Sequence, residues 1–236
     1  MSAPLDQVKV ILFDAGDTLF RVKGGVGAVY AAVAARFGVN ADPDLLHRRF
    51  IAAWPRKPPL VFPGVLPEDL PAFEQNWWKG LVQEVFEETP LPDFDPFFHT
   101  LYAEFEGEGA WELFPETVGV LQHLKAAGYR LGIVSNFDSR LFKICERLGI
   151  RHYFETIVVS TGAGAAKPSP LIFQRALASL DILPLNSLYV GDSPKHDLAG
   201  ANCAGLWSVL LDRSEKYPNE GGTRIKSLAE LAGLLR

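Results

Sequence analysis

Cysteine is scarce in this sequence, since Cys145 and Cys203 are the only two thiols among 236 residues. Both have apolar neighbours, so we expect two buried, unreactive thiols rather than a disulfide or a redox pair. Runs of lysine and arginine are also missing, and the net charge is -5. Because binding along a nucleic acid requires a basic surface, we expect no nucleic-acid partner.

Long hydrophobic runs are absent as well. No apolar run of the sequence approaches the ~18 residues of a membrane span, and its first residues show no basic region followed by a long apolar core. We therefore expect neither a signal peptide nor a membrane span, and a cytoplasmic location by default. What remains is an ordinary globular composition, 48% hydrophobic and 22% charged, of a length that suits one domain with a large insertion or two domains.

The most informative stretch is residues 8–20, Val-Lys-Val-Ile-Leu-Phe-Asp-Ala-Gly-Asp-Thr-Leu-Phe. Its nearly continuous apolar start predicts a strand buried on both faces. Asp14 follows where this strand ends, and in an open parallel sheet the ligand crevice lies beyond the carboxyl ends of the strands. Gly16 permits a tight turn there, and Thr18 can offer a hydroxyl to a nearby anion. Taken alone, however, Asp-x-Gly after a strand is more often only a turn.

Residues 21–112 change to the spacing of amphipathic helices. We find no clear strand in them, and apolar residues at helical spacing mark four candidate helices, near 26–37, 45–51, 73–86 and 97–105. Six prolines fall within residues 55–71, which predicts a stiff loop from Trp54 to Pro71. We therefore predict a helical insertion that occupies residues 21–112.

From Phe114 onwards, strands and helices alternate. The patterns predict buried strands at 130–134, 156–159, 188–192 and 207–211, and helices at 115–128, 141–148, 169–180, 197–203 and 227–235. Repeated strand, helix and strand with short loops imply right-handed crossovers and a parallel sheet. The expected fold class is α/β, with a doubly wound, Rossmann-like parallel sheet built from residues 1–20 and 113–236.

Polar side chains gather at one edge of this expected sheet, because the carboxyl ends of parallel strands meet there. Four polar signatures belong to this edge: Asp14, Ser135-Asn136, Lys167, and Asp192 with Asp197. Taken alone, Asp192 with Asp197 is more typical of a turn and a helix cap, and Ser135-Asn136 is also typical of an ordinary strand-end cap. Lys167 lies just before a helix N-terminus, where the helix dipole disfavours a cation unless an anion shares the position. This favours Lys167 as a charge clamp over an exposed lysine.

Together these residues resemble the four ordered motifs of the haloacid dehalogenase-like hydrolase superfamily. The matching segments are Asp14-Ala-Gly-Asp-Thr-Leu19, Ser135-Asn136, Lys167-Pro168 and Gly191-Asp192-x4-Asp197. The resemblance spans residues 8–211, and the helical insertion corresponds to the cap that one branch of the family, subfamily I, places after its first motif. Residues 135–140, Ser-Asn-Phe-Asp-Ser-Arg, further resemble the rhythmically-expressed-gene-type subgroup.

This resemblance implies a Mg2+-dependent phosphoric monoester hydrolase that acts on a small phosphorylated molecule through an aspartyl-phosphate. Asp14 is then the nucleophile, and Lys167 clamps both the phosphate and Asp14. Hard oxygen ligands for Mg2+ come from the carboxylates of Asp14 and Asp192 and the Gly16 carbonyl. Asp197 either joins these ligands or orients a water or Lys167.

The phosphate itself is expected to contact three further groups. The resemblance assigns this role to the Ser135 hydroxyl and the Asn136 backbone N–H, with Thr18 as an additional hydroxyl close by. No histidine pair has metal-ligand spacing, and we interpret His196, the histidine nearest the site, as a solvated loop residue.

One residue departs from the family's commonest phosphatase motif. Gly16 stands where those phosphatases carry an aspartate that protonates the leaving alcohol. The adjacent Asp17 either replaces this acid through a local shift of the loop or is structural. A leaving alkoxide without a proton donor forfeits a factor of roughly 10²–10⁴ in rate. Aryl and acyl phosphates, which are better leaving groups, should suffer least.

Gly16 keeps other functions open. A 2-haloacid dehalogenase needs no acid for a halide, although it has no use for acidic residues at 192 and 197. Phosphonate hydrolysis with Lys57 as a Schiff base is a weaker variant, and Lys57 is also a candidate substrate contact. A binding or regulatory protein without turnover is the alternative from another class. The sequence does not distinguish a monomer from a homodimer, and we expect the cap to close over the site through hinges at residues 21–25 and 111–115.

Overall fold

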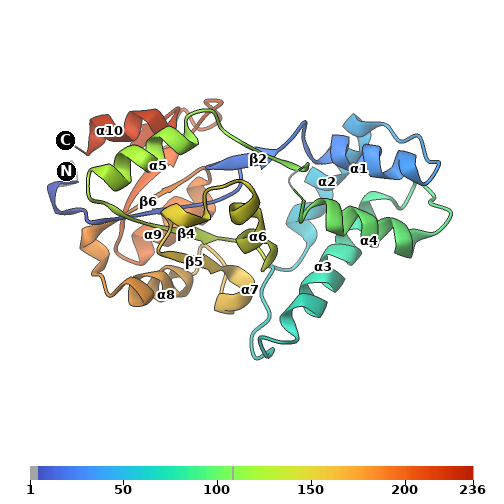
Figure 1. Ribbon diagram of the computed structural model, residues 1–236, viewed down its shortest axis with the longest axis horizontal. Helices are drawn as coiled ribbons and strands as arrows, with labels where there is room; N and C mark the ends of the chain where they lie inside the picture. The colour runs from blue at the N-terminus through green and yellow to red at the C-terminus, as the bar shows by residue number, and fades with distance from the viewer. Residues whose placement is uncertain (1–4, 108, 236) are drawn as a thin grey trace.

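The computed structural model describes residues 5–107 and 109–235 and consists of a sheet with helices on both faces and a group of helices that extends to one side. Figure 1 shows these two parts, with α5, α8 and α10 around the sheet and α1 to α4 at the other end of the molecule. This arrangement confirms the predicted α/β fold with a helical insertion.

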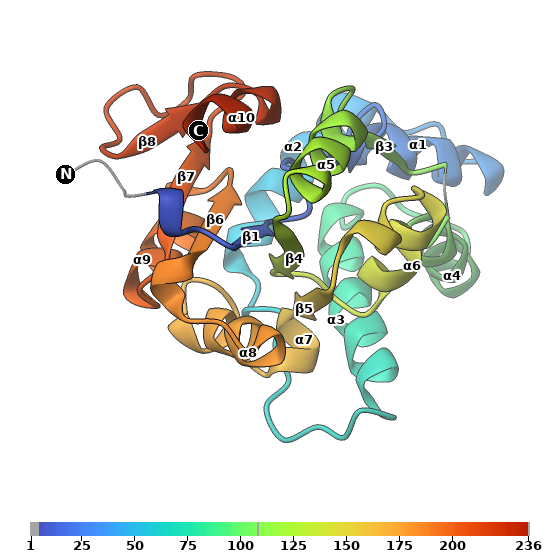
Figure 2. The same ribbon diagram turned by 60° about the vertical axis from the view of Figure 1, so that its left-hand side comes forward.

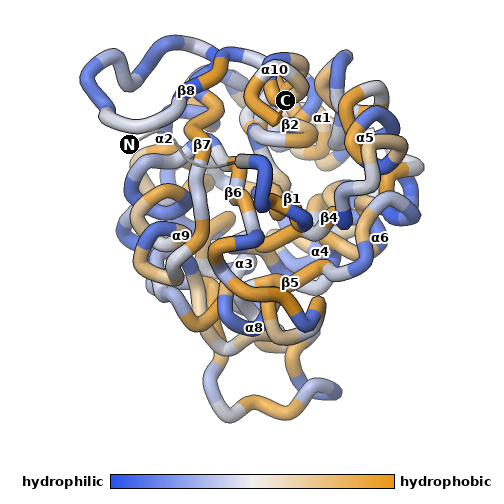
Figure 3. The backbone as a smooth tube through the Cα atoms, turned by 90° about the vertical axis from the view of Figure 1, so that its left-hand side faces the viewer, coloured by the Kyte–Doolittle hydropathy of each residue, from blue (hydrophilic) through white to orange (hydrophobic). Residues whose placement is uncertain are grey.

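Six parallel strands form the sheet, in the order β5-β4-β1-β6-β7-β8. Their bounds are β1 Val10–Phe13, β4 Arg130–Ser135, β5 Thr156–Val159, β6 Ser187–Gly191, β7 Trp207–Leu211 and β8 Thr223–Ile225. β1 lies between β4 and β6, and all four of its residues are buried, as the continuous apolar run predicts. Figure 3 shows the apolar colour concentrated on the strands in the middle of the core. Edge strand β8 escaped prediction because it is short and its first two residues are exposed.

Helices cover both faces of the sheet, as in a doubly wound fold (Figure 2). One face packs against α5, α6 and α10, and the other against α8 and α9. Their bounds are α5 Thr117–Ala126, α6 Arg140–Arg147, α7 Ser160–Ala163, α8 Pro170–Leu180, α9 Ala199–Cys203 and α10 Leu231–Leu234. The start of α8 follows the predicted cap, since the Ser169 side chain accepts a hydrogen bond from the Leu171 N–H.

The helical insertion has its own apolar core, formed by all four of its helices. These are α1 Val26–Arg36, α2 Pro43–Ala53, α3 Leu70–Val85 and α4 Phe94–Glu104. We call this part the cap. The expectation of no strand within 21–112 is wrong, because β2 (Phe20–Val22) pairs antiparallel with β3 (Trp111–Leu113). These strands are three residues each and lie far apart in sequence, so no local turn announces their pairing.

The β2–β3 ribbon joins the cap to the sheet. Arg21 and Glu112, directly opposite each other on the two strands, form an ion pair with a 2.7 Å N···O distance. Both predicted hinge segments therefore lie in or beside one paired ribbon. The predicted domain boundaries at 20/21 and 112/113 cut these two strands and stay a prediction, as do the hinges.

Several helix ends differ from the expected ones. The proline-rich segment begins with a 3-10 turn, Trp54–Arg56, and Pro71 already lies in the first turn of α3, where a missing N–H is tolerated. The helix predicted at 197–203 is a π-helix, Pro194–Leu198, continued by α9, and the last predicted helix is a 3-10 turn, Leu228–Glu230, continued by α10. Further 3-10 turns lie at Leu5–Gln7, Arg151–Tyr153 and Pro184–Asn186.

The two thiols have different surroundings. Cys145 is buried in α6, but Cys203 is exposed, so the prediction of two buried thiols is wrong for Cys203. It is the last residue of the short helix α9. Among the helices within the described ranges, none combines the length and the apolar character that a membrane crossing requires.

Candidate active site

Asp14 lies directly after β1, at the carboxyl edge of the sheet. Its backbone N–H donates to the Val190 carbonyl at 2.9 Å, so the chain still follows the neighbouring strand β6 at this point. The residue is 8% exposed. A carboxylate that is fixed by a sheet and almost buried needs a positive partner, because burial without one is costly.

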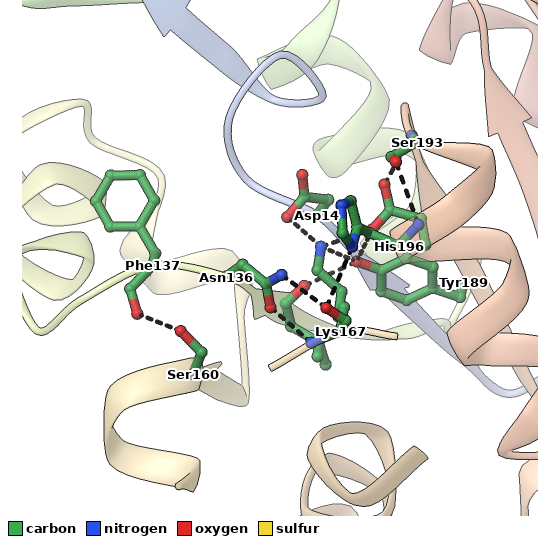
Figure 4. A network of polar contacts seen from close by, with 10 residues as sticks. Asp14, Asn136, Phe137, Ser160, Lys167, Tyr189, Ser193 and His196 are labelled. Atoms are coloured by element: carbon green, nitrogen blue, oxygen red, sulfur yellow. Dashed lines mark hydrogen bonds and ion pairs between the residues drawn. The ribbon is translucent and has the colours of Figure 1, made fainter. Parts of the chain in front are cut away.

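Lys167 supplies that partner (Figure 4). Its Nζ lies 2.6 Å from Asp14 Oδ1, 2.6 Å from Asp197 Oδ1 and 2.9 Å from the Tyr189 hydroxyl. The three acceptors use the three protons of the ammonium group, and Lys167 is only 4% exposed. The predicted clamp between Lys167 and Asp14 is therefore present as a direct contact.

The backbone of Lys167 is held by Asn136. Asn136 Oδ1 accepts from the Lys167 N–H at 2.7 Å, and its Nδ2 donates to the Lys167 carbonyl at 3.0 Å. His196 Nδ1 lies 3.3 Å from the same carbonyl. His196 is half-buried and belongs to the π-helix, so the interpretation as a solvated loop histidine is wrong. The π-helix turns the ring inward onto Lys167, an orientation that the sequence does not reveal.

Three carboxylates, Asp14, Asp192 and Asp197, offer oxygens that all lie within 4.8 Å of one another, and we call them the acidic cluster. Asp197 Oδ2 accepts from the Ser193 N–H at 2.9 Å, which fixes this carboxylate against the loop after β6. Gly191 permits this approach, because a Cβ there would overlap the Asp197 side chain.

The charges of the acidic cluster are not balanced by Lys167 alone. Burial raises the pKa of Asp14, and the attraction of Lys167 only partly opposes this. Burial, together with repulsion from Asp14 and Asp197, raises the pKa of Asp192 to about 8. Burial by itself would lower the pKa of Lys167, but its two carboxylate partners outweigh burial and raise it. Three hard oxygen donors with a deficit of positive charge suit a divalent cation such as Mg2+.

The loop after Asp14 carries the other first-motif residues. Asp17 has a φ of 56°, in the left-handed region, and its N–H donates to the Phe20 carbonyl at 2.7 Å. Asp17 is an exposed residue. The protein around its carboxyl group nevertheless removes part of the hydration and raises its pKa, against the attraction of nearby cations. The charge of Asp17 in turn contributes to the raised pKa of Asp192. Asp17 is therefore close to the acidic cluster. Beside Gly16 a Cβ would meet no atom within 4 Å.

Ser135 and Thr18 are both buried polar residues at this edge. Ser135 ends β4, and its proximity lowers the pKa of Asp14 against the effect of burial. The Thr18 hydroxyl has no hydrogen-bond partner within the described residues. Of the predicted substrate contacts, Lys57 is directed elsewhere: its Nζ donates to the Gly80 carbonyl at 2.9 Å and pairs with Glu84 at 3.1 Å, both in α3.

Sequence reasoning missed Tyr189. Its hydroxyl accepts from Lys167, lies 2.8 Å from the Val134 carbonyl, to which it donates, and is 3.1 Å from Asp197 Oδ1. A signal was available, because a phenol inside a strand that is buried on both faces must find a polar partner. The partner could be expected at the edge where the other polar residues gather.

Sequence reasoning also missed Arg213, which follows β7. Its guanidinium donates to the Thr18 carbonyl at 2.9 Å and to Glu116 at 2.6 Å, and it stacks on Phe114 with 3.6 Å between its central carbon and the ring centroid. Arg213 thereby ties the loop of Asp17 and Thr18 to the segment that re-enters the core from the cap. No local pattern distinguishes this arginine from a solvated one.

The fold and this site define a hydrolase class. Residues 8–205 match the family described as haloacid dehalogenase-like hydrolase, and the chain belongs to that family. It is 32% identical over 209 residues to the haloacid dehalogenase-like hydrolase domain-containing protein 3 of Bos taurus, which covers 87% of this chain and 82% of the relative. It is 29% identical over 226 residues to the Rhythmically expressed gene 2 protein of Drosophila melanogaster, covering 90% and 86%. These matches confirm the resemblance drawn from the motifs.

A shorter match is to a relative whose name states a particular enzyme activity. Over 100 residues, 42% of this chain and 44% of the relative, the chain is 38% identical to the glyceraldehyde 3-phosphate phosphatase of Methanothermobacter thermautotrophicus. Among solved structures, the putative HAD-hydrolase YfnB from Bacillus subtilis, bound to magnesium, has a TM-score of 0.71 at 20% identity and 97% and 98% coverage. The L-2-haloacid dehalogenase from Xanthobacter autotrophicus has 0.73 at 15% identity with the same coverage. At these identities the two structures show a shared fold.

Proposed function

We propose that this protein is a Mg2+-dependent phosphatase that hydrolyses a small phosphorylated molecule through an aspartyl-phosphate on Asp14. The observation that carries the proposal is the buried contact of Lys167 with Asp14 and Asp197, next to the carboxylate of Asp192. Support comes from the phosphatase relative and from the magnesium in a structure of the same fold.

The phosphate of the substrate would be bound by groups at the sheet edge. The Ser135 hydroxyl and the Asn136 N–H donate to its oxygens, Lys167 neutralises its charge, and the buried Thr18 hydroxyl is a further donor beside it. Asn136 holds the backbone of Lys167 at the same time, so the two phosphate-binding segments keep one geometry.

In the first step, a carboxylate oxygen of Asp14 bonds to phosphorus while the ester P–O bond breaks, and the leaving oxygen takes both bonding electrons and a proton from Asp17. In the second step, water attacks the same phosphorus and gives a proton to the Asp17 carboxylate, while the bond between Asp14 and phosphorus breaks with its electrons returning to Asp14. Inorganic phosphate leaves, and both aspartates return to their starting states. The surrounding protein removes part of the hydration of the Asp17 carboxyl and raises its pKa, which keeps its proton available closer to neutral pH than in an ordinary aspartic acid.

Mg2+ would be held by Asp14, Asp192 and the Gly16 carbonyl, with Asp197 as a further ligand or as the residue that fixes Lys167. When bound, it supplies the positive charge that lets a carboxylate approach a phosphate dianion. The residues fit this ion, because their oxygens converge within 4.8 Å and Lys167 leaves the cluster with excess negative charge.

The first test is hydrolysis of acetyl phosphate and p-nitrophenyl phosphate with Mg2+ or EDTA. We expect Mg2+-dependent turnover that Asp14→Asn and Asp192→Asn abolish and that the exposed control Asp6→Asn leaves unchanged. EDTA-insensitive halide release from 2-haloacids would replace the phosphatase proposal with the dehalogenase alternative. Turnover of neither substrate class would leave a binding or regulatory protein.

The role of Asp17 is tested by loss and by gain. Asp17→Asn should slow an alkyl phosphate by roughly 10²-fold or more, and acetyl phosphate much less, because only the alkoxide needs a proton. Gly16→Asp should accelerate the alkyl phosphate, since the backbone at Gly16 is not in the left-handed region and the space beside it is open. An equal loss for both esters in Asp17→Asn would make Asp17 structural.

A further inference from the structure

Glu74, in the cap helix α3, is a fully buried carboxylate at the interface between cap and core. Its Oε1 accepts from the Ser139 N–H at 3.0 Å and from the Thr161 hydroxyl at 2.6 Å, and its Oε2 accepts from the Ser139 hydroxyl at 2.5 Å. All three donors belong to the core, and within residues 5–107 and 109–235 no lysine, arginine or histidine forms an ion pair with Glu74. Hydrogen bonds to a buried carboxylate are strong, and leaving one unmade is costly.

One turn further along α3, Trp78 makes a second contact with the same loop. Its Nε1 donates to Asp138 Oδ2 at 2.5 Å, and Asp138 also binds the guanidinium of Arg140 at 2.9 and 2.6 Å. The guanidinium carbon of Arg140 lies 4.9 Å from the Trp78 ring centroid. Residues four apart share one helix face, so a single face of α3 holds this loop.

The loop in question, residues 136–139, connects β4 to α6. Ser135, the last residue of β4, and Asn136, the first of the loop, are the two proposed phosphate-binding residues. One end is fixed to the core, since Asn136 bonds to Lys167. The other end is fixed to the cap, since Ser139 bonds to Glu74 only three residues further on. Ser139 also precedes the first turn of α6, where a negative charge is favourable.

We propose that Glu74 is a positioning residue through which the cap sets the geometry of the phosphate-binding loop. This rests on the proposed phosphatase function. With the cap docked, Ser139 is held and the donors of Ser135 and Asn136 are aligned. Phosphate binding and cap docking are then coupled, and by linkage each strengthens the other. Glu74 does not touch the substrate and acts on the phosphate-binding loop through Ser139, while its bond with Thr161 fixes the carboxylate to the core.

The test compares Glu74→Gln, Ser139→Ala, the double variant and Glu68→Gln, an exposed residue just before α3 that undergoes the same chemical change. Glutamine keeps the volume but replaces one accepting oxygen with an NH2 group, which cannot accept. We expect KM for acetyl phosphate and the inhibition constant of inorganic phosphate to rise together by about tenfold in Glu74→Gln. The turnover number should change by less than about twofold.

A merely structural role gives a different result. Loss of folded protein lowers the turnover number and leaves KM and the phosphate inhibition constant unchanged, which would overturn the proposal. Glu74→Gln and Ser139→Ala act on one contact, so the double variant should resemble Glu74→Gln rather than show the product of the two effects. Multiplied effects would show that Glu74 does not act through Ser139.

Hydrogen exchange supplies a readout that needs no activity. Amides of residues 136–141 should exchange faster in Glu74→Gln than in the wild type and in Glu68→Gln, because the loop loses its cap contact. Unchanged exchange in this segment would overturn the proposal whatever the kinetics. A wild type that hydrolyses no phosphate ester would refute the proposed function and the phosphate role of Glu74 together, whereas turnover with unchanged KM refutes Glu74 alone.

Discussion

Removal of the Lys167 ammonium group tests the electrostatics of the site most directly. Lys167→Met keeps the length of the side chain but leaves Asp14 and Asp197 without their shared partner, each of which lies 2.6 Å from Nζ. Breaking a buried ion pair by removing one partner costs about 3–5 kcal/mol, because the remaining charge is uncompensated. For a chain of this size, that loss should lower the melting temperature by roughly 6–20 °C.

The assay is thermal and urea unfolding in EDTA at pH 7.5, with Lys9→Met as the control because Lys9 is exposed. Mg2+ should raise the melting temperature of the Lys167→Met protein more than that of the wild type, since a divalent cation then compensates the acidic cluster. A melting temperature within about 2 °C of the Lys9→Met control would mean that the ion pair is worth less than about 1 kcal/mol, which would refute this reasoning.

The same variant should respond to pH in a defined direction. Burial and repulsion raise the pKa of Asp192 to about 8, and burial raises that of Asp14. A carboxyl group whose pKa is raised by folding stabilises the protein fully below its unfolded value, near 3.8, and loses that contribution as the pH rises through the folded pKa. Lys167 lowers the pKa of both carboxyls, so its removal raises these pKa values further and makes their ionisation costlier in the variant than in the wild type. The deficit of Lys167→Met in EDTA should therefore grow between pH 5 and about pH 8. A deficit independent of pH would contradict this explanation.

Three other predictions concern thiols, packing and acid stability. In the native protein a thiol reagent should modify exposed Cys203 quickly and spare Cys145, whose pKa burial raises to about 12, with both reacting after denaturation. Gly191→Ala should lower the free energy of unfolding by about 1–3 kcal/mol and weaken Mg2+ binding, because the new methyl group overlaps the acidic cluster. Scanning and titration calorimetry measure these two effects. The pKa of Glu116 is lowered because its hydrogen bond and charge interaction with Arg213 outweigh burial. Glu116→Gln should therefore be less stable than the wild type near neutral pH, and the difference should shrink in acid unfolding as the pH falls through the lowered pKa, below 4.5.

Much of the core could be predicted because its signals are local. The apolar run before Asp14 predicts a strand whose two faces are both covered by helices. The residue that follows such a strand lies at the carboxyl edge of the sheet. Ser169 and Pro170 mark the start of α8 by cap chemistry alone, and the structure begins the helix at Pro170. Features of this kind need only a few consecutive residues.

Features that depend on distant pairing were missed. In the β2–β3 pair, Arg21 lies opposite Glu112, 91 positions away in the sequence. No local pattern in either strand therefore reveals its partner. Tyr189 shows the intermediate case. The strand was predicted, and the burial of a phenol within it demands a polar partner, but the identity of that partner depends on how Lys167 enters the site from another loop.

The segment Phe137–Arg140 shows why a motif and its role are separate inferences. Its residues were identified by resemblance, yet Asp138 and Arg140 are buried with 0% and 5% exposure, an unusual fate for two charged residues that follow a strand. They are buried because Trp78 of the cap covers them and donates to Asp138. This segment therefore contacts the cap, and substitutions in it should alter cap docking first and the chemistry at Asp14 through the loop between them.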